Sequence, residues 1–289
     1  MLLEALREIN KHDLSTQKAA TCNLKDKTPI YLVTYGEGDV YIANMKVLAE
    51  SALNNCVDVV YMYRKEHLDK TFVEKNQKIL EAARGAGYWL WKPYIVLKTM
   101  EQIPENSIIV YLDSGAKIIH PLDRFINELG NDDILLLDNP PYLNKDHVKR
   151  DLLIFMNMDN HKVRNTGQLS AGIFVMRNTE HSREFVRKWL EIGEMGWTID
   201  DSPSSDEYPE FEAHRHDQSI LSLLSIQNPH RIKVSSFYDM LNDIWLHKRR
   251  SLDKSLVISR DGKKMQMSIL GKRLEELLRW IKRIEEEKL

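Results

Sequence analysis

Residues 107–115 have the sequence Ser-Ile-Ile-Val-Tyr-Leu-Asp-Ser-Gly, and this stretch decides the fold. Its continuous apolar run is typical of a strand that is buried on both faces, as in a parallel sheet covered by helices. The run ends abruptly at Asp113, Ser114 and Gly115. In open α/β sheets, ligands bind outside the carboxyl ends of the strands. The sequence therefore predicts that Asp113 meets a metal ion or a polar ligand at the edge of a sheet.

Strand patterns and helix patterns alternate on both sides of this stretch. Residues 30–34 and 57–63 are rich in β-branched and aromatic side chains, which favours strands. Apolar residues at helical spacing follow each of them. Pro93 is suited to the first turn of a helix, and residues 134–137 predict a further strand. This order predicts an α/β fold with a mostly parallel central sheet and helices on both faces.

The second half of the chain is less regular. The elements predicted there are a strand over residues 170–176, a helix over 179–192 with its first residue as N-cap, and a helix over 216–226. Residues 194–213 form an acidic segment without helical or strand periodicity. Loops of this length are usually functional or mobile, and a solvated surface excursion is the equally weighted alternative.

Length and composition exclude several classes of protein. The 289 residues suffice for one large domain with a sizeable core, and a formal net charge of −2 argues against a dedicated nucleic-acid binder. The longest apolar runs are far shorter than the ~20 residues that cross a bilayer. Glutamates interrupt the apolar start of the chain, so no signal peptide is expected. Cys22 and Cys56 imply no disulfide framework, which favours the reducing cytoplasm.

Five separated motifs carry a resemblance to a known family. They span residues 87–93 (Gly-Tyr-Trp-Leu-Trp-Lys-Pro), 111–115, 170–172 (Ser-Ala-Gly), 216–218 (His-Asp-Gln) and 247–250 (His-Lys-Arg-Arg). In order and spacing they resemble glycosyltransferases of the GT-A fold, in particular sugar transferases of capsule and surface-polysaccharide loci. The order of the motifs also resembles that of the retaining family-8 enzymes.

The resemblance implies a fold and a division of the chain. The GT-A fold is a Rossmann-like fold of transferases that use nucleotide-diphospho-sugars. The expected GT-A domain covers residues 27–250. Residues 1–26 are expected to form an N-terminal helical extension, and residues 251–289 a C-terminal strand and helix extension packed on the domain.

The resemblance also implies a metal site. Asp113 holds the first position of the Asp-x-Asp motif, which in this fold binds Mn²⁺ or Mg²⁺ on the nucleotide diphosphate. Gly115 replaces the second aspartate, so one carboxylate ligand is missing and metal dependence stays open. By similarity, His247 is the candidate second ligand. The alternative for residues 247–250 is a solvated basic turn, and the alternative for Asp113 is a plain turn or N-cap residue. The candidate diphosphate contacts beside His247 are Lys248, Arg249 and Arg250.

Further positions are expected to bind the donor. In this fold the end of the first strand meets the uracil and ribose, and Lys92, beside a helix N-terminus, suits a diphosphate or a sugar hydroxyl. The candidate nucleotide-sugar contacts are Thr34, Tyr35, Gly36, Trp91, Lys92, Asp113, Ser114, Gly115, Gln168, Ser170, Ala171 and Gly172. Trp89 and Trp91 are more often core anchors than ligand contacts, and a plain tight turn at Gly36 is equally expected.

The resemblance places the chemistry at Asp217 and Gln218. Family-8 enzymes carry Asp-Gln-Asp at this point, whereas this chain has Asp217-Gln218-Ser219. The carboxylate can bind sugar hydroxyls or stabilise positive charge at the anomeric carbon, and the amide oxygen of Gln218 can face the same carbon. In an inverting enzyme Asp217 would instead deprotonate the acceptor. The structural alternative is an N-cap aspartate.

One more motif points to the acceptor side. Residues 149–151 have the sequence Lys-Arg-Asp, which is similar to an element of the polysaccharide-locus relatives. A helix start with Asp151 in its first turn is at least as well supported.

These observations predict a metal-assisted hexosyltransferase of polysaccharide biosynthesis. It would move a hexose from a UDP-sugar to a glycan or lipid-linked acceptor, with retention favoured over inversion. We expect it in the cytoplasm without a nucleic-acid partner, and peripheral contact with the inner face of the membrane stays open. The alternative is a non-catalytic member that binds glycans or scaffolds a polysaccharide assembly, which Gly115 supports.

Overall fold

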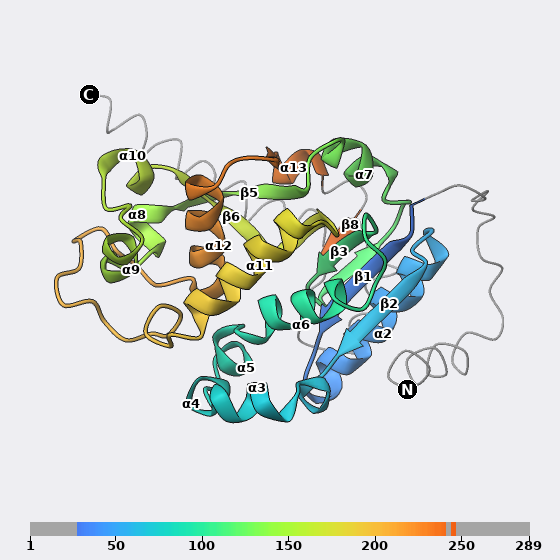
Figure 1. Ribbon diagram of the computed structural model, residues 1–289, viewed down its shortest axis with the longest axis horizontal. Helices are drawn as coiled ribbons and strands as arrows, with labels where there is room; N and C mark the ends of the chain where they lie inside the picture. Colours follow the sequence, from blue (N-terminus) through green and yellow to red (C-terminus); the bar gives the residue numbers. More distant parts are fainter. Residues whose placement is uncertain (1–27, 241–243, 247–289) are drawn as a thin grey trace, which may run out of the picture.

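A computed structural model describes residues 28–240 and 244–246, and its centre is a six-stranded sheet in the order β2-β1-β3-β6-β5-β7 (Figure 1). β6 is antiparallel to β3 and β5, and the other neighbouring strands are parallel. The predicted α/β fold with a mostly parallel sheet is therefore confirmed. The strands are β1 (Ile30–Tyr35), β2 (Val59–Tyr63), β3 (Ile108–Leu112), β5 (Ile134–Leu143), β6 (Gly167–Arg177) and β7 (Ile232–Ser235), with β4 (Ala116–Ile118) and β8 (Ile244–Leu246) in a separate antiparallel pair.

Helices cover both faces of this sheet (Figure 1). α6, α11 and α12 pack on one face, while α2, α7 and α13 contribute to the core on the other. The helices are α2 (Gly38–Asn54), α3 (Lys70–Lys75), α4 (Gln77–Leu80), α5 (Gly85–Tyr88), α6 (Trp91–Met100), α7 (Asp123–Leu129), α8 (Asn144–His147), α9 (Arg150–Phe155), α10 (His161–Arg164), α11 (Glu180–Gly193), α12 (His216–Gln227) and α13 (Phe237–Met240), with a 3₁₀ turn η1 (Lys65–His67).

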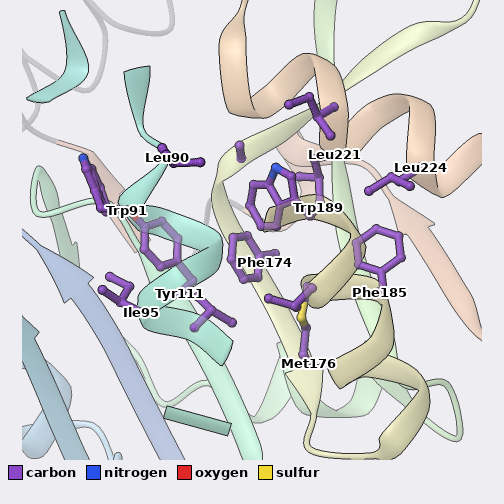
Figure 2. Packing of buried hydrophobic residues seen from close by; sticks show 14 of the residues in the cluster. Leu90, Trp91, Ile95, Tyr111, Phe174, Met176, Phe185, Trp189, Leu221 and Leu224 are labelled. Atoms are coloured by element: carbon purple, nitrogen blue, oxygen red, sulfur yellow. The ribbon is translucent and has the colours of Figure 1, made fainter. Parts of the chain in front are cut away.

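The strand β3 is apolar throughout because its two faces enter two different cores. Ile109 and Tyr111 belong to the core under α6, α11 and α12, and the other three residues of β3 belong to the core on the α2 face. Figure 2 shows Tyr111 beside Phe174, whose ring meets Trp189 edge to face; the ring centroids are 4.9 and 5.8 Å apart. This packing fixes the end of β3 relative to the helices, and therefore fixes where the site can form.

Two helix predictions had different outcomes. Thr179 caps α11 as predicted, because its hydroxyl accepts a hydrogen bond from the backbone N–H of Ser182 at 3.3 Å. The helical spacing predicted after residues 57–63 does not give one continuous helix, since α3 and α4 are separated at Asn76. The Asn76 amide donates to the Phe72 carbonyl at 3.1 Å and to the Glu194 carboxylate at 2.9 Å. Its side chain thus joins the break to the end of α11.

Among the described residues, no helix is long and apolar enough to cross a bilayer. Cys56, which follows α2 with a φ of 68°, is disulfide-bonded, although the sequence implied no disulfide framework. Cys22, the other cysteine of the sequence, lies outside the described residues. So do the extensions predicted for residues 1–26 and 251–289 and the basic motif at residues 247–250.

Candidate active site

Two cavities meet at the carboxyl ends of β1 and β3. The first has a volume of about 320 Å³ and is lined by Tyr35, Gly36 and Ser114 among others. The second has a volume of about 330 Å³ and is lined by residues of α6, β6 and α12. Asp113 and Trp89 line both. The prediction that Asp113 sits where a ligand is met agrees with this position.

Aromatic side chains form a wall of the first cavity. The rings of Tyr35 and Trp91 stack with centroids 3.9 Å apart and planes 14° apart, and the Trp91 indole donates to the Gly85 carbonyl at 2.9 Å. Gly36 permits the close approach of α2, since a Cβ there would lie 2.9 Å from the Cβ of Tyr41. Thr34, a predicted donor contact, is fully buried within β1 and lines neither cavity. Tyr35 and Trp91 are themselves largely buried, so they present the margin of the stack to the cavity.

A strained turn leads into α6. Ala86, Tyr88 and Trp89 all have left-handed backbones, with φ of 51°, 52° and 62°. His216 also has a positive φ, 53°, and its ring lies 5.1 Å from that of Tyr88 and 5.3 Å from that of Trp89. Each such non-glycine residue costs on the order of 1 kcal/mol or more, and survives only where the surroundings enforce it. Two strained segments therefore support each other at the second cavity.

Lys92 joins the two candidate carboxylates. Its ammonium lies 2.6 Å from Oδ2 of Asp217 and 4.0 Å from Oδ1 of Asp113, and the residue is 2% exposed. The Tyr111 hydroxyl donates to the same oxygen of Asp113 at 2.9 Å. Lys92, a predicted contact of a diphosphate or a sugar hydroxyl, thus lines the second cavity but is buried there between two carboxylates. Arg215 is the N-cap of α12 and Asp217 lies in its first turn, so the N-cap interpretation of Asp217 is wrong.

Burial sets the charge states around this lysine. Desolvation raises the pKa of Asp217 to about 6, although Lys92 opposes the shift. Burial also lowers the pKa of His214 to about 3, so this imidazole is neutral at pH 7. The indole of Trp189 donates to the backbone carbonyl of Asp217 at 2.9 Å, which fixes the start of α12. Asp217 is therefore a carboxylate that titrates close to neutral pH.

Hydrogen bonds orient the amide of Gln218 at both ends. Its Nε2 donates to Oε1 of Gln168 at 2.6 Å, and its Oε1 accepts from the Asn139 amide at 3.2 Å. Gln168 is fully buried and also donates to the hydroxyl of Ser219 at 3.2 Å. The carbonyl oxygen of Gln218 keeps one further lone pair for a ligand.

The predicted small residues of β6 lie against Asp113. The backbone N–H of Asp113 donates to the Gly172 carbonyl at 3.0 Å, and a Cβ at Gly172 would lie 3.1 Å from Oδ2 of Asp113. Ala171 lines the second cavity, and the Ser170 hydroxyl accepts from the Gly172 N–H at 3.3 Å. Glycine at this position leaves room for the carboxylate.

The sequence matches the model of the galactosyl transferase GMA12/MNN10 family over residues 26–257. The chain belongs to this family. It is a GT-A-fold glycosyltransferase, as the motifs predicted. A search of curated proteins found no match.

Three solved structures have a similar fold. Mouse xyloside xylosyltransferase 1, in its apo form, aligns with a TM-score of 0.42 and 15% identity over 72% of this chain and 84% of that chain. A glycosyltransferase involved in glycosylation of the major capsid of PBCV-1 aligns with a TM-score of 0.44 and 11% identity, over 73% of this chain and 83% of that chain. The bifunctional glycosyltransferase WbbM, also apo, aligns with a TM-score of 0.43 and 14% identity, over 75% of this chain and 40% of that chain.

The predicted acceptor-side motif anchors the acidic loop of this glycosyltransferase. Lys149 is 2% exposed, and its ammonium lies 2.9 Å from the carboxylate of Asp200 and 3.2 Å from the carbonyl of Ser202. Arg150 pairs with Asp159 at 3.1 Å and with Asp206 of the loop. These residues do not line the second cavity themselves; they hold down the loop, and residues 213–215 at its end line that cavity.

Asp113 is the predicted metal ligand that lies within the described residues. The Asp113 side chain is 26% exposed and lines both cavities, which suits a ligand of a hard divalent cation. Within residues 28–240 and 244–246, no group of three potential ligands could hold a metal ion. His247, the predicted second ligand, lies outside the described residues, as do Lys248, Arg249 and Arg250.

Sequence reasoning misses the site roles of Tyr111, Arg215 and His147. His147 lines the second cavity from α8, and its Nδ1 lies 3.2 Å from the Ala213 carbonyl. Alternating strand residues such as Tyr111 can be found by their position two residues before Asp113. The others depend on contacts between distant segments.

Proposed function

We propose that this glycosyltransferase moves a hexose from a UDP-sugar to a glycan or lipid-linked acceptor, with retention at the anomeric carbon. The observation that carries the proposal is the Asp113–Lys92–Asp217 arrangement at the junction of two cavities. One cavity offers an aromatic wall, and the other offers carboxylate, amide and histidine groups. This division suits a donor whose nucleotide and sugar differ in polarity.

The first cavity would hold the nucleotide. The margin of the Tyr35–Trp91 stack supplies an apolar contact for a base, and Gly36 lets the ribose approach the backbone closely. Burial raises the pKa of the Tyr35 hydroxyl, so it stays protonated and donates to Glu37. Glu37 lines the cavity and is placed to accept from a ribose hydroxyl.

Asp113 would hold a divalent ion on the diphosphate, with His247 as the proposed second protein ligand. When bound, such an ion neutralises the charge that develops on the leaving diphosphate. The hydrogen bond from Tyr111 and the space beside Gly172 orient Asp113 for this role. The ammonium of Lys92 lies 4.0 Å from the same carboxylate.

Asp217 and Gln218 would flank the reacting carbon. The bond from the anomeric carbon to the diphosphate oxygen breaks with its electron pair leaving on the diphosphate, and positive charge develops on the sugar. Asp217 stabilises that charge when it is ionised. The oriented amide oxygen of Gln218 faces the same region. The acceptor oxygen then bonds to the carbon on the face that the diphosphate leaves, and its proton passes to a diphosphate oxygen.

Donor-dependent release of UDP tests the proposal. The enzyme is incubated with a panel of UDP-hexoses, with Mn²⁺ or with a chelator, and UDP is measured; UDP-galactose comes first because of the family's description. NMR of the anomeric proton of the product reports retention or inversion. An inverted product would make Asp217 the acceptor base instead. Folded protein that binds glycan but releases no UDP from any donor would support the non-catalytic alternative.

We propose a cytoplasmic location separately from the reaction. The disulfide at Cys56 argues against this location, because disulfides persist mainly in oxidising compartments. Fractionation of cells, combined with labelling of free thiols at Cys56, tests this location.

A further inference from the structure

Arg215 has an unusual position at the mouth of the second cavity. It lies directly before α12, is half-buried and lines this cavity. Its guanidinium lies 3.4 Å from the centre of the Tyr142 ring, and its backbone N–H donates to the His147 carbonyl at 3.2 Å. The ring and the backbone bond together hold the side chain in one place. Stacking on an aromatic face leaves the edge of the guanidinium, with its N–H groups, available.

No carboxylate of the described residues pairs with the guanidinium of Arg215. Within the part of the chain that the structure describes, its side chain makes no hydrogen bond or ion pair. The other two permanent cations that line this cavity do have partners. Arg84 lies 3.6 Å from Asp201, and Lys92 lies 2.6 Å from Asp217.

Two histidines and two carboxylates of this cavity do not offset Arg215 either. Burial lowers the pKa of both His214 and His216, so both imidazoles are neutral at pH 7. Asp113 and Asp217 face Lys92. The half-buried guanidinium therefore stacks on Tyr142 without a carboxylate at its edge, and an anionic ligand could occupy that edge.

We propose that Arg215 recognises an anionic substituent, a carboxylate or a phosphate, on the acceptor sugar. The inference rests on the proposed function, because it assigns the second cavity to the acceptor as well as to the donor sugar. Arg215 packs against Tyr142 and His147, whereas the proposed nucleotide wall is formed by Tyr35 and Trp91. The anion therefore belongs to the end of the site away from the nucleobase. Carboxylate and phosphate share the paired oxygens that a guanidinium binds with two N–H groups.

Binding of simple sugars in the presence of UDP tests the inference. The probes are methyl β-D-glucuronide, glucose 6-phosphate and the neutral methyl β-D-glucoside, and binding is followed by saturation-transfer NMR. We expect one or both anionic probes to bind at least about tenfold more tightly than the glucoside, as charge-assisted hydrogen bonds do. The probe that is preferred distinguishes carboxylate from phosphate. The preference should weaken as the salt concentration rises.

Two variants of Arg215 and one control make the test specific. Arg215→Gln should remove the preference, and Arg215→Lys should keep part of it, because lysine has the charge without the planar fork. Arg187→Gln is the matched control, since Arg187 lies on α11 and pairs with Glu184 away from the cavity. Affinity for UDP is measured in all proteins.

Each outcome decides between named possibilities. Equal binding of charged and neutral probes to the wild type would overturn the inference. A loss of UDP affinity in Arg215→Gln, with no preference among the sugars, would overturn it too and make Arg215 a diphosphate contact. If the wild type prefers the anionic probes through Arg215 but releases no UDP from any donor, the transferase mechanism fails and the anion site stands.

Discussion

Replacement of Lys92 by methionine should move the pH dependence of the enzyme. The ammonium of Lys92 lies 2.6 Å from Asp217, whose pKa is about 6 in spite of full burial. An opposite charge at this distance lowers the pKa of a carboxyl by about 1–3 units. Its removal should therefore raise the pKa of Asp217 from about 6 into the range of about 7–9. Methionine retains much of the volume, so the change is mainly electrostatic.

The raised pKa of Asp217 predicts that Lys92→Met loses activity at pH 7 and regains it at higher pH. At pH 7 a carboxyl with a pKa of 6 is about nine-tenths ionised, and one with a pKa of 8 is about one-tenth ionised. If ionised Asp217 is required, the rate at pH 7 falls about tenfold in Lys92→Met and recovers as the pH approaches 9. A variant that is merely misfolded would not recover in this way.

The same shift predicts a change in stability with a definite sign. The pKa of Asp217 is higher in the folded protein than in the unfolded chain, where it is near 3.8. The folded state then binds the proton more tightly, so this group's contribution to stability falls as the pH rises from about 4 through the folded pKa. In Lys92→Met the fall continues to higher pH. If the pKa of Asp217 rises by two further units in this variant, the free energy of unfolding above pH 8 falls by about 3 kcal/mol. This loss is similar to the cost of breaking a buried ion pair.

The assay combines a pH–rate profile of UDP release with urea unfolding at several pH values. Lys98→Met is the matched control, because Lys98 lies on the same helix but pairs with the exposed carboxylate of Asp69. The double variant Lys92→Met with Asp217→Asn should regain stability at high pH, since no buried charge is left uncompensated. If Lys92→Met is folded and the acid limb of its pH–rate profile still has its midpoint near pH 6, the electrostatic role of Lys92 is refuted.

Three further predictions concern other parts of the site. Asp217→Asn should leave donor affinity within about tenfold while kcat falls much more, because the amide keeps its size but carries no charge; a loss confined to KM would make Asp217 a sugar contact only. Gly172→Ala should weaken Mn²⁺-dependent UDP binding, measured by calorimetry, since its Cβ would lie 3.1 Å from Oδ2 of Asp113 and must displace the carboxylate. Lys149→Met should make residues 194–213 more sensitive to limited proteolysis, because it removes a buried cation that holds Asp200 and Ser202; unchanged cleavage would mean that other contacts retain the loop.

Much of the fold could be predicted because its signals are local. The run that ends at Asp113 is apolar at every position, because both faces of this strand are covered by core residues. The α11 cap at Thr179 is a short-range hydrogen bond of the kind that a sequence shows directly. The position of Gly172 beside Asp113, by contrast, follows from the antiparallel pairing of β6 with β3 and has no local signal.

The site could be predicted only in part, because its geometry depends on distant contacts. Lys92 and Asp217 are 125 positions apart in the sequence, and nothing near either residue indicates their ion pair. The left-handed backbones at Ala86, Tyr88 and Trp89 are equally hidden. Glycine signals such a conformation in a sequence, whereas at other residues the packing imposes it.

The strained turn and the buried lysine belong to one arrangement. Trp91 and Lys92 are adjacent in the first turn of α6, yet Trp91 stacks on Tyr35 in the first cavity and Lys92 bonds Asp217 in the second. A left-handed residue at position 89 sets the direction in which this turn begins. Two carboxylates at the ends of different elements would repel each other without the ammonium between them. The strain therefore keeps one cation in the place where both carboxylates need it, and it links the nucleotide wall rigidly to the proposed reacting carboxylate.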